Sequence, residues 1–274
     1  FAVIGLFVFF YLSGMKTSLL FISVFLSANL FGQNVYIPDA NFKADLLGNQ
    51  EINTNGDTEI QVSEASSFTG TIDCQDISIS DLTGIEAFTA ITELNCRENN
   101  ISSLNVSNNN ALTVLICDEN NMLSLNLSNN PALTMLNCDE NNLTALDVSN
   151  CTDLMMLNCY DNQITSLNLS NNAALTSLHC YNNELQCLNI KNGNNTAIID
   201  FFANGNFNLS CIEVDDVNYS TINWTSIAAQ ASFSEDCNND CSSSNAGTNE
   251  LNSSKNLIFV LDLMGRETTF KPNT

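Results

Sequence analysis

Residues 133–143 read Leu-Thr-Met-Leu-Asn-Cys-Asp-Glu-Asn-Asn-Leu, and this order of residue types returns every 21 residues between positions 91 and 185. Each of the five copies has leucine or isoleucine first, leucine fourth, cysteine sixth and asparagine ninth. A unit this short cannot bury its own apolar side chains, so each copy must stack on the next. The spacing therefore predicts a solenoid whose parallel strands lie about 4.8 Å apart, with little helix inside the repeats.

The pattern L-x-x-L-x-C-x-x-N-x-L resembles the leucine-rich repeat of the short bacterial kind. This resemblance implies a right-handed solenoid, which we predict over residues 71–216. Pro38 and Asp39 mark a helix start, so residues 33–70 are expected to form a small helical cap. Residues 217–241 are expected to form an irregular cap at the other end, because the terminal coils of a solenoid must be covered.

The ninth position of the repeat is predicted to have a structural role. The chain leaves the strand there, and an amide side chain can bond to backbone groups that are otherwise buried unpaired. Because stacking repeats the arrangement, we predict a ladder formed by Asn99, Asn120, Asn141, Asn162 and Asn183. Ser-Asn-Asn at residues 107–109, 128–130 and 170–172 is predicted to form polar turns.

The 11 cysteines fall into groups by their spacing. Six replace leucine in an inward-facing column and are predicted to be buried, inert thiols, since an equally spaced line offers no tetrahedral metal site. These six are Cys74, Cys96, Cys117, Cys138, Cys159 and Cys180. Cys187 and Cys211 precede inward-facing residues in consecutive coils, so we predict a disulfide between them. Cys237 and Cys241 are a second candidate pair, and Cys151 is expected to be free.

Residues 53–64 contain the one candidate for a bound cofactor, a calcium ion. Asn53, Asn55, Asp57 and Glu64 place oxygen ligands at positions one, three, five and twelve, as in an EF-hand loop. The first position is asparagine and the glycine lies at position four instead of six, which departs from that loop. The alternative is an Asn-Gly turn leading into a short helix that caps the first coil.

Strand residues between the inward-facing columns are expected to point to the concave surface, the usual binding face of repeat proteins. In the middle coils these residues combine apolar, aromatic and acidic side chains, and Met and Tyr in particular are favoured at recognition surfaces. The candidate ligand-binding residues are Val114, Ile116, Asp118, Met135, Asp139, Met156, Tyr160, His179 and Tyr181. The alternative is a scatter of surface apolar residues that binds nothing.

The net charge of the chain argues against some classes of binding partner. Thirty acidic residues against seven basic ones give a formal net charge of −23, which repels nucleic acids and anionic membrane surfaces. The chain has one histidine and lacks a Gly-x-Ser-x-Gly elbow, a His-Glu-x-x-His motif and a phosphate-binding loop, so we expect no enzyme. A glycan-active enzyme using Asp118 and Asp139 is a distant alternative, because stacked coils are not expected to form a cleft.

Both ends of the chain carry features of export. Met15 and the residues after it are typical of a secretory signal peptide, so residues 1–32 are predicted to be an upstream extension and a cleaved signal. Neither apolar run there reaches the roughly 20 residues that a membrane anchor needs. The Ser/Asn-rich residues 242–254 are predicted to be a linker. Residues 255–274 resemble the truncated start of the sorting domain used by the type IX secretion system of Bacteroidetes.

Residues 37–42 (Ile-Pro-Asp-Ala-Asn-Phe), the repeats and residues 211–216 (Cys-Ile-Glu-Val-Asp-Asp) together resemble secreted leucine-rich-repeat proteins of flavobacteria. The resemblance implies a secreted or cell-surface adhesion module that binds a protein or glycan and is exported by the type IX machinery. The mature chain is expected not to insert into a membrane. A structural spacer of the cell surface or matrix, with no specific ligand, is the alternative.

Overall fold

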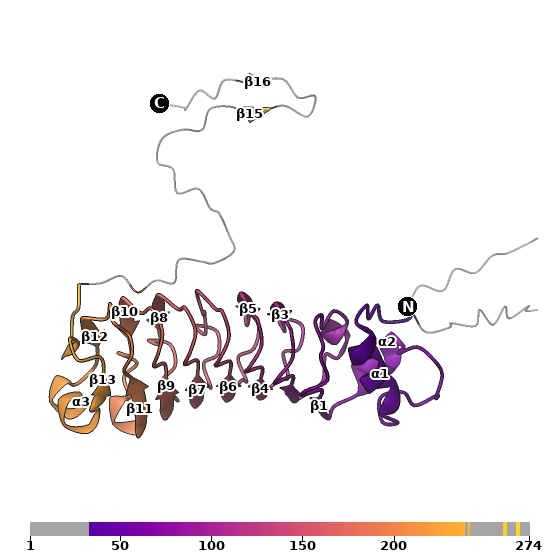
Figure 1. The fold of residues 1–274 in the computed structure, drawn as a ribbon, viewed down its shortest axis with the longest axis horizontal. Helices are drawn as coiled ribbons and strands as arrows, with labels where there is room; N and C mark the ends of the chain where they lie inside the picture. Colours follow the sequence, from indigo (N-terminus) through magenta and orange to yellow (C-terminus); the bar gives the residue numbers. More distant parts are fainter. Residues whose placement is uncertain (1–32, 239–240, 242–259, 262–266, 269–274) are drawn as a thin grey trace, which may run out of the picture. The chain divides into compact units, whose positions relative to one another are not determined.

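The computed structural model describes residues 33–238, 241, 260–261 and 267–268 (Figure 1). The predicted extension and signal peptide, the predicted linker and most of the predicted sorting segment lie outside the described residues. Within the described part of the chain, no helix is long and apolar enough to cross a membrane.

The chain winds into stacked coils, each of which adds one strand to a parallel sheet. Leu115 pairs with Leu94 of the coil before it and with Leu136 of the coil after it, so equal repeat positions lie side by side. The predicted parallel-strand solenoid with little helix inside the repeats is confirmed. The eight strands are, in spatial order, β1 (Thr71–Asp73), β2 (Glu93–Asn95), β4 (Val114–Ile116), β6 (Met135–Asn137), β7 (Met156–Asn158), β9 (Ser177–His179), β11 (Asp200–Ala203) and β13 (Ser226–Ile227).

A second row of short parallel strands lies in the other half of the coils. It consists of a pair, β3 (Ser103–Asn105) and β5 (Ser124–Asn126), and a four-stranded sheet of β8 (Ser166–Asn168), β10 (Cys187–Asn189), β12 (Cys211–Glu213) and β14 (Ser232–Ser234). Its register also joins equal repeat positions, such as Leu167 with Leu188. Elsewhere, β15 (Val260–Leu261) pairs with β16 (Glu267–Thr268).

The apolar columns of the repeat form a continuous core. The fourth-position leucines of the coils, such as Leu115 and Leu136, are fully buried, and so are the sixth-position cysteines. In β4 and β6 the middle side chain points inward and the two beside it point outward, because successive side chains of a strand alternate between its faces. Burying one leucine contributes about 1.5–3 kcal/mol, so these columns are the main source of cohesion between coils.

The amino-terminal cap contains α1 (Ala40–Gly48) and α2 (Val62–Ser67), and η1 (Ile85–Ala87) follows in the first coil. The Asp39 carboxylate accepts backbone N–H groups in the first turn of α1, including that of Phe42, which explains the helix start. The side chain of Phe42 is fully buried. The cap thereby covers the open end of the first coil.

η2 (Asn195–Ala197) lies in the coil before β11, and the carboxy-terminal cap contains α3 (Val217–Asn223). Trp224 follows α3, and its indole N–H donates to the carbonyl oxygen of Ile198 at 3.1 Å. Its ring stacks on Phe201 with 4.5 Å between the centroids. Since Trp224 is 3% exposed, it closes the apolar column at this end.

Two disulfide bonds tie the last described residues of the cap to the coils. Cys187 is bonded to Cys241, and Cys211 is bonded to Cys237. The predicted bond between Cys187 and Cys211 is therefore wrong, and so is the pairing of Cys237 with Cys241.

The path of the chain explains this difference. Leu188 pairs with Ile212, so Cys187 and Cys211 do lie in neighbouring coils as expected. After β14, however, the chain returns along the second row of strands, where the Ser166 hydroxyl donates to the carbonyl oxygen of Cys241. Each of the two later cysteines thus meets one of the earlier ones.

The remaining seven cysteines are free and buried. Burial raises the pKa of the Cys180 thiol to about 12, and burial with nearby carboxylates raises that of Cys74 to about 12. Cys151 is buried as well, and its pKa is raised to about 11. A thiol with such a pKa is rarely ionised near neutral pH and is a poor nucleophile.

The ninth-position asparagines are buried and hydrogen bonded between coils. Oδ1 of Asn141 accepts the backbone N–H of Met122 at 2.9 Å, and its Nδ2 donates to the carbonyl oxygens of Cys117 and Cys138. The same bonds recur at Asn99, Asn120, Asn162 and Asn183. Each amide therefore satisfies backbone groups that the core would otherwise leave unpaired.

A second set of buried asparagines was not predicted. The last residue of each Ser-Asn-Asn triplet is fully buried, although the triplets are predicted only as polar turns. Nδ2 of Asn130 donates to the carbonyl oxygens of Val106 and Asn109 in the preceding coil, at 3.1 and 2.9 Å. This set comprises Asn109, Asn130 and Asn172.

Candidate interaction surface

The outward side chains of the eight-stranded sheet form the surface that the sequence predicts to be concave, called the sheet face below. Figure 1 shows the strands of this sheet side by side along the coils. Because the register joins equal repeat positions, each outward position forms a row that runs across the coils.

The middle of the sheet face is apolar. Met135 pairs with Val114 on one side and with Met156 on the other, and all three are half-buried. Ile116 lies on the same face two positions after Val114. Methionine adapts its shape to a contacting surface, so these residues provide an adaptable apolar patch.

Tyr160 and Tyr181 form a stacked pair beside this patch. Their ring centroids are 4.4 Å apart, with 6° between the ring planes. Burial raises the pKa of Tyr160 above its ordinary value, and so does the neighbouring Asp139 carboxylate. The stacking holds the two half-buried rings against each other, and the hydroxyl of Tyr160 stays protonated near neutral pH.

His179 contacts an aromatic residue that the sequence analysis missed. Phe202 in β11 pairs with His179 in β9, and the two rings meet edge to face with 4.8 Å between centroids. Phe202 is 38% exposed. It was not predicted because the candidate residues come from the five regular coils, and Phe202 lies in the next coil, after a spacing longer than 21 residues.

Asp118 and Asp139 lie beneath the sheet face, at 4% and 2% exposure. Both are predicted ligand-binding residues of this face, but neighbouring side chains cover them, so their predicted exposure to a ligand is wrong. Nε of Arg97 lies 3.0 Å from Oδ2 of Asp118, and the Tyr160 hydroxyl is close enough to Asp139 to affect its pKa. Burial raises the pKa of Asp139 to about 6, and it also raises the pKa of Asp118, against the opposing effect of Arg97.

A row of acidic residues along the edge of the sheet face was also missed. One residue per coil, at the eighth repeat position, has a left-handed backbone with φ between 48° and 53°. Asparagine and glycine adopt this conformation more readily than glutamate. The row consists of Asp76, Glu98, Glu119, Glu140 and Asp161. The signal was present in the sequence, since five consecutive coils have an acid at this position.

The candidate calcium residues bond to one another and to the backbone. The Glu64 carboxylate accepts the backbone N–H groups of Thr54 and Gln61, at 2.9 and 3.0 Å. Nδ2 of Asn53 donates to the carbonyl oxygen of Asp57 at 3.1 Å. Glu64 forms a capping box with Gln61 at the start of α2, which is the alternative of a turn leading into a helix. Among the described residues, no group of three His, Cys, Asp or Glu side chains is arranged to hold a metal ion.

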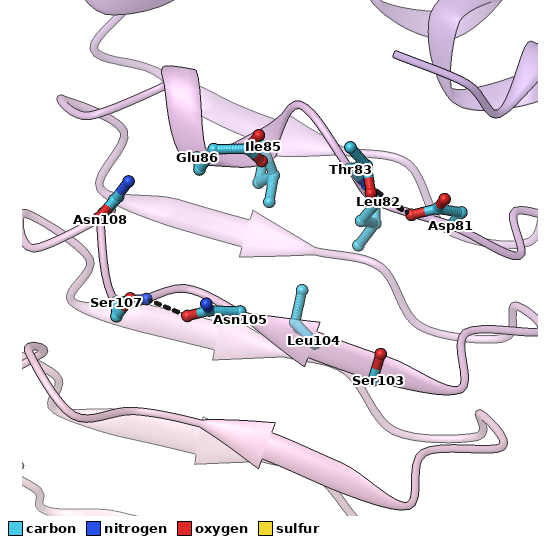
Figure 2. A pocket seen from close by; sticks show the side chains of 10 residues that line it. All are labelled: Asp81, Leu82, Thr83, Ile85, Glu86, Ser103, Leu104, Asn105, Ser107 and Asn108. Carbon is cyan, nitrogen blue, oxygen red and sulfur yellow. Dashed lines mark hydrogen bonds between the residues drawn. The ribbon is translucent and has the colours of Figure 1, made fainter. Parts of the chain in front are cut away.

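A polar hollow of about 390 Å³ lies beside β3, between residues 81–86 and residues 103–108 (Figure 2). The Asp81 carboxylate accepts the N–H and the hydroxyl of Thr83, and Oδ1 of Asn105 accepts the N–H of Ser107. These are local turn contacts. No predicted site residue lines the hollow, so it is separate from the sheet face.

No family model matches the chain. A stretch of 77 residues, 28% of this chain, is 40% identical to Internalin J of Listeria monocytogenes and spans 8% of that protein. An internalin of the same species, inlF, shares 18% identity at a TM-score of 0.52, over 76% of this chain and 74% of its own. The chain has the leucine-rich-repeat fold.

The functional domain of InlJ from Listeria monocytogenes, described as including a cysteine ladder, is 33% identical to this chain. The match covers 66% of this chain and 38% of that one, at a TM-score of 0.49. Over the 77 matched residues this leucine-rich-repeat chain is homologous to Internalin J, and it spans well under two thirds of the length of that relative.

Proposed function

We propose that the chain is a non-catalytic recognition or adhesion module that binds a protein or glycan through the sheet face. The observation that carries this proposal is the stacked pair of Tyr160 and Tyr181 beside the half-buried residues Met135 and Met156. Aromatic and methionine side chains are enriched where proteins bind partners. Held rings also lose little conformational freedom when a partner docks on them.

The likeness to internalins supports the same proposal. The relatives are leucine-rich-repeat proteins of a type that binds proteins or mediates adhesion, and this favours a protein as the partner. The likeness does not identify that partner. His179 and Phe202 extend the aromatic part of the sheet face and enlarge the area available to it.

Export is part of the proposal. The signal-like residues after Met15 and the resemblance to a sorting domain at 255–274 support secretion or display at the cell surface, through the type IX machinery of a flavobacterium. The two disulfide bonds are consistent with this location, because disulfides persist outside the reducing cytosol.

Two alternatives make different predictions. A structural spacer has the same solenoid but binds nothing through the sheet face. A glycan-active enzyme needs two accessible carboxylates, whereas Asp118 and Asp139 are buried under their neighbours. Release of reducing sugar from polysaccharides would favour the enzyme.

Affinity capture tests the proposal. The full chain is immobilised and exposed to cell-surface proteins and to a glycan array, beside a Tyr160→Ala/Tyr181→Ala variant whose unfolding temperature matches that of the parent. Capture by the parent alone is the expected result. Equal capture by both, or by neither, would contradict recognition through the tyrosine pair.

A further inference from the structure

The acidic row along the sheet face has the same backbone geometry in each coil. The backbone N–H of Glu98 donates to the carbonyl oxygen of Asp118, and that of Glu119 donates to Asp139 in the same way, at 3.2 and 3.1 Å. The N–H of Glu140 likewise donates to Tyr160 at 3.1 Å. Successive carboxylates of the row are therefore carried on equivalent backbone positions one coil apart, which is about 4.8 Å in a parallel sheet.

The first part of this row holds a guanidinium group. Nη2 of Arg97 lies 2.9 Å from a carboxylate oxygen of Glu98 and also contacts the carboxylate of Glu119 in the next coil. Nε of Arg97 pairs with the buried Asp118 between them. One arginine thus bridges two carboxylates of the row and neutralises the acid beneath them.

The next carboxylates of the row have no such partner. Among the described residues, no basic side chain forms an ion pair with Glu140 or Asp161. Where the first coil has Arg97, the following coils have Asp118 and Asp139 at the same repeat position. One coil later, Glu119, Glu140 and the buried Asp139 therefore repeat the arrangement of Glu98, Glu119 and Asp118, but without a guanidinium group.

The buried Asp139 of the next coil lacks the ion pair that Arg97 gives to Asp118. Asp139 is 2% exposed, no basic side chain among the described residues pairs with it, and its Oδ1, like Oδ1 of Asp118, has no hydrogen-bond partner. A buried carboxylate oxygen without a donor is costly. The stacked rings of Tyr160 and Tyr181 stand beside it, and aromatic rings are a favourable surface for the stem and head of an arginine.

We propose that the sheet face binds a protein segment bearing an exposed arginine, whose guanidinium bridges Glu119 and Glu140 as Arg97 bridges Glu98 and Glu119, with its stem against Tyr160. The inference rests on the proposed function and specifies its partner. The formal net charge of −23 opposes a second copy of this chain as the occupant and attracts a basic segment.

A pentapeptide of alternating leucine and arginine, labelled with fluorescein, tests this proposal with the full chain. Its binding is measured by fluorescence anisotropy beside two matched peptides in which lysine or citrulline replaces arginine. Citrulline keeps the shape of arginine without its charge. We expect the arginine peptide to bind at concentrations up to about 1 mM, the lysine peptide to bind several-fold more weakly, and the citrulline peptide not to bind.

The variant Glu140→Gln/Asp161→Asn removes one of the two bridged carboxylates and the next negative charge of the row. It is expected to weaken binding of the arginine peptide by about fivefold or more, because neutral amides do not attract a guanidinium. Asp147→Asn/Asp153→Asn removes two exposed carboxylates outside the row and serves as the control of equal charge change. Raising sodium chloride from about 50 mM to about 500 mM should also weaken the binding of the arginine peptide to the parent chain.

Three results would overturn the inference: no binding of the arginine peptide at about 1 mM, equal binding of the citrulline peptide, or an equal effect of the two double variants. Failure of the arginine inference can be distinguished from failure of the proposed function. A natural partner that is lost from Tyr160→Ala/Tyr181→Ala but retained by Glu140→Gln/Asp161→Asn would support recognition and overturn the arginine inference.

Discussion

Oδ1 of Asn141 accepts the backbone N–H of Met122 in the preceding coil, with 2.9 Å between the two atoms. Asn141→Ala leaves that N–H and two carbonyl oxygens without partners in the core, so we expect the free energy of unfolding to fall by about 1–3 kcal/mol. Urea unfolding measures the loss. Asn150→Ala, at an exposed turn position, is the control, and equal losses in the two variants would contradict a buried ladder.

The free thiols should not react in the folded chain. All seven are buried, and burial raises the pKa of Cys180 to about 12, so thiolate is scarce near neutral pH. We expect a thiol-reactive chromophore to label none of them quickly before unfolding and all seven after it. One rapidly labelled thiol in the folded state would argue against the buried column.

Cys241→Ser should release a single new thiol, at Cys187, and leave the bond between Cys211 and Cys237 intact. Alkylation followed by non-reducing peptide mapping locates the thiol. Loss of a native disulfide typically costs about 2–5 kcal/mol, so the cap should also become easier to cleave by protease. A parent map that links Cys187 to Cys211 would refute the observed pairing.

Asp139 gives the stability of the chain a pH dependence. Its folded pKa is raised to about 6 from an ordinary 3.8, so the folded state holds its proton more strongly than the unfolded state. The associated stability is present below about pH 4 and is lost as the pH rises through about 6.

Asp139→Asn keeps the size of the side chain and removes its titration. Relative to the parent, we expect its unfolding free energy to rise by about 1–3 kcal/mol between about pH 4 and pH 7 and to stay level above that. Urea unfolding at a series of pH values measures this difference. A difference that is independent of pH would show that Asp139 titrates normally.

The repeat made most of the fold predictable. Because the 21-residue spacing places Leu115 against Leu136, the sheet, the core and the ninth-position asparagines follow from one pattern. The disulfides did not follow, since the spacing brings Cys187 and Cys211 into neighbouring coils but says nothing of the returning chain that carries Cys241.

The site was predicted in part for a similar physical reason. Tyr160 and Tyr181 occupy equal repeat positions, so their proximity is a property of the pattern. The burial of Asp139 depends on the conformations of the neighbouring side chains, which the repeat spacing alone does not determine. The spacing before Phe202 is longer than 21 residues, so the regular repeat does not by itself place Phe202 beside His179.

Recognition through the sheet face is tested most directly by the dissociation constant of a captured partner for the parent chain and for Tyr160→Ala/Tyr181→Ala, at matched unfolding temperatures. We expect the variant to bind at least about tenfold more weakly, because aromatic anchors carry much of the binding energy in interfaces. Equal dissociation constants would contradict recognition through the tyrosine pair, and the absence of any captured partner would favour a structural spacer.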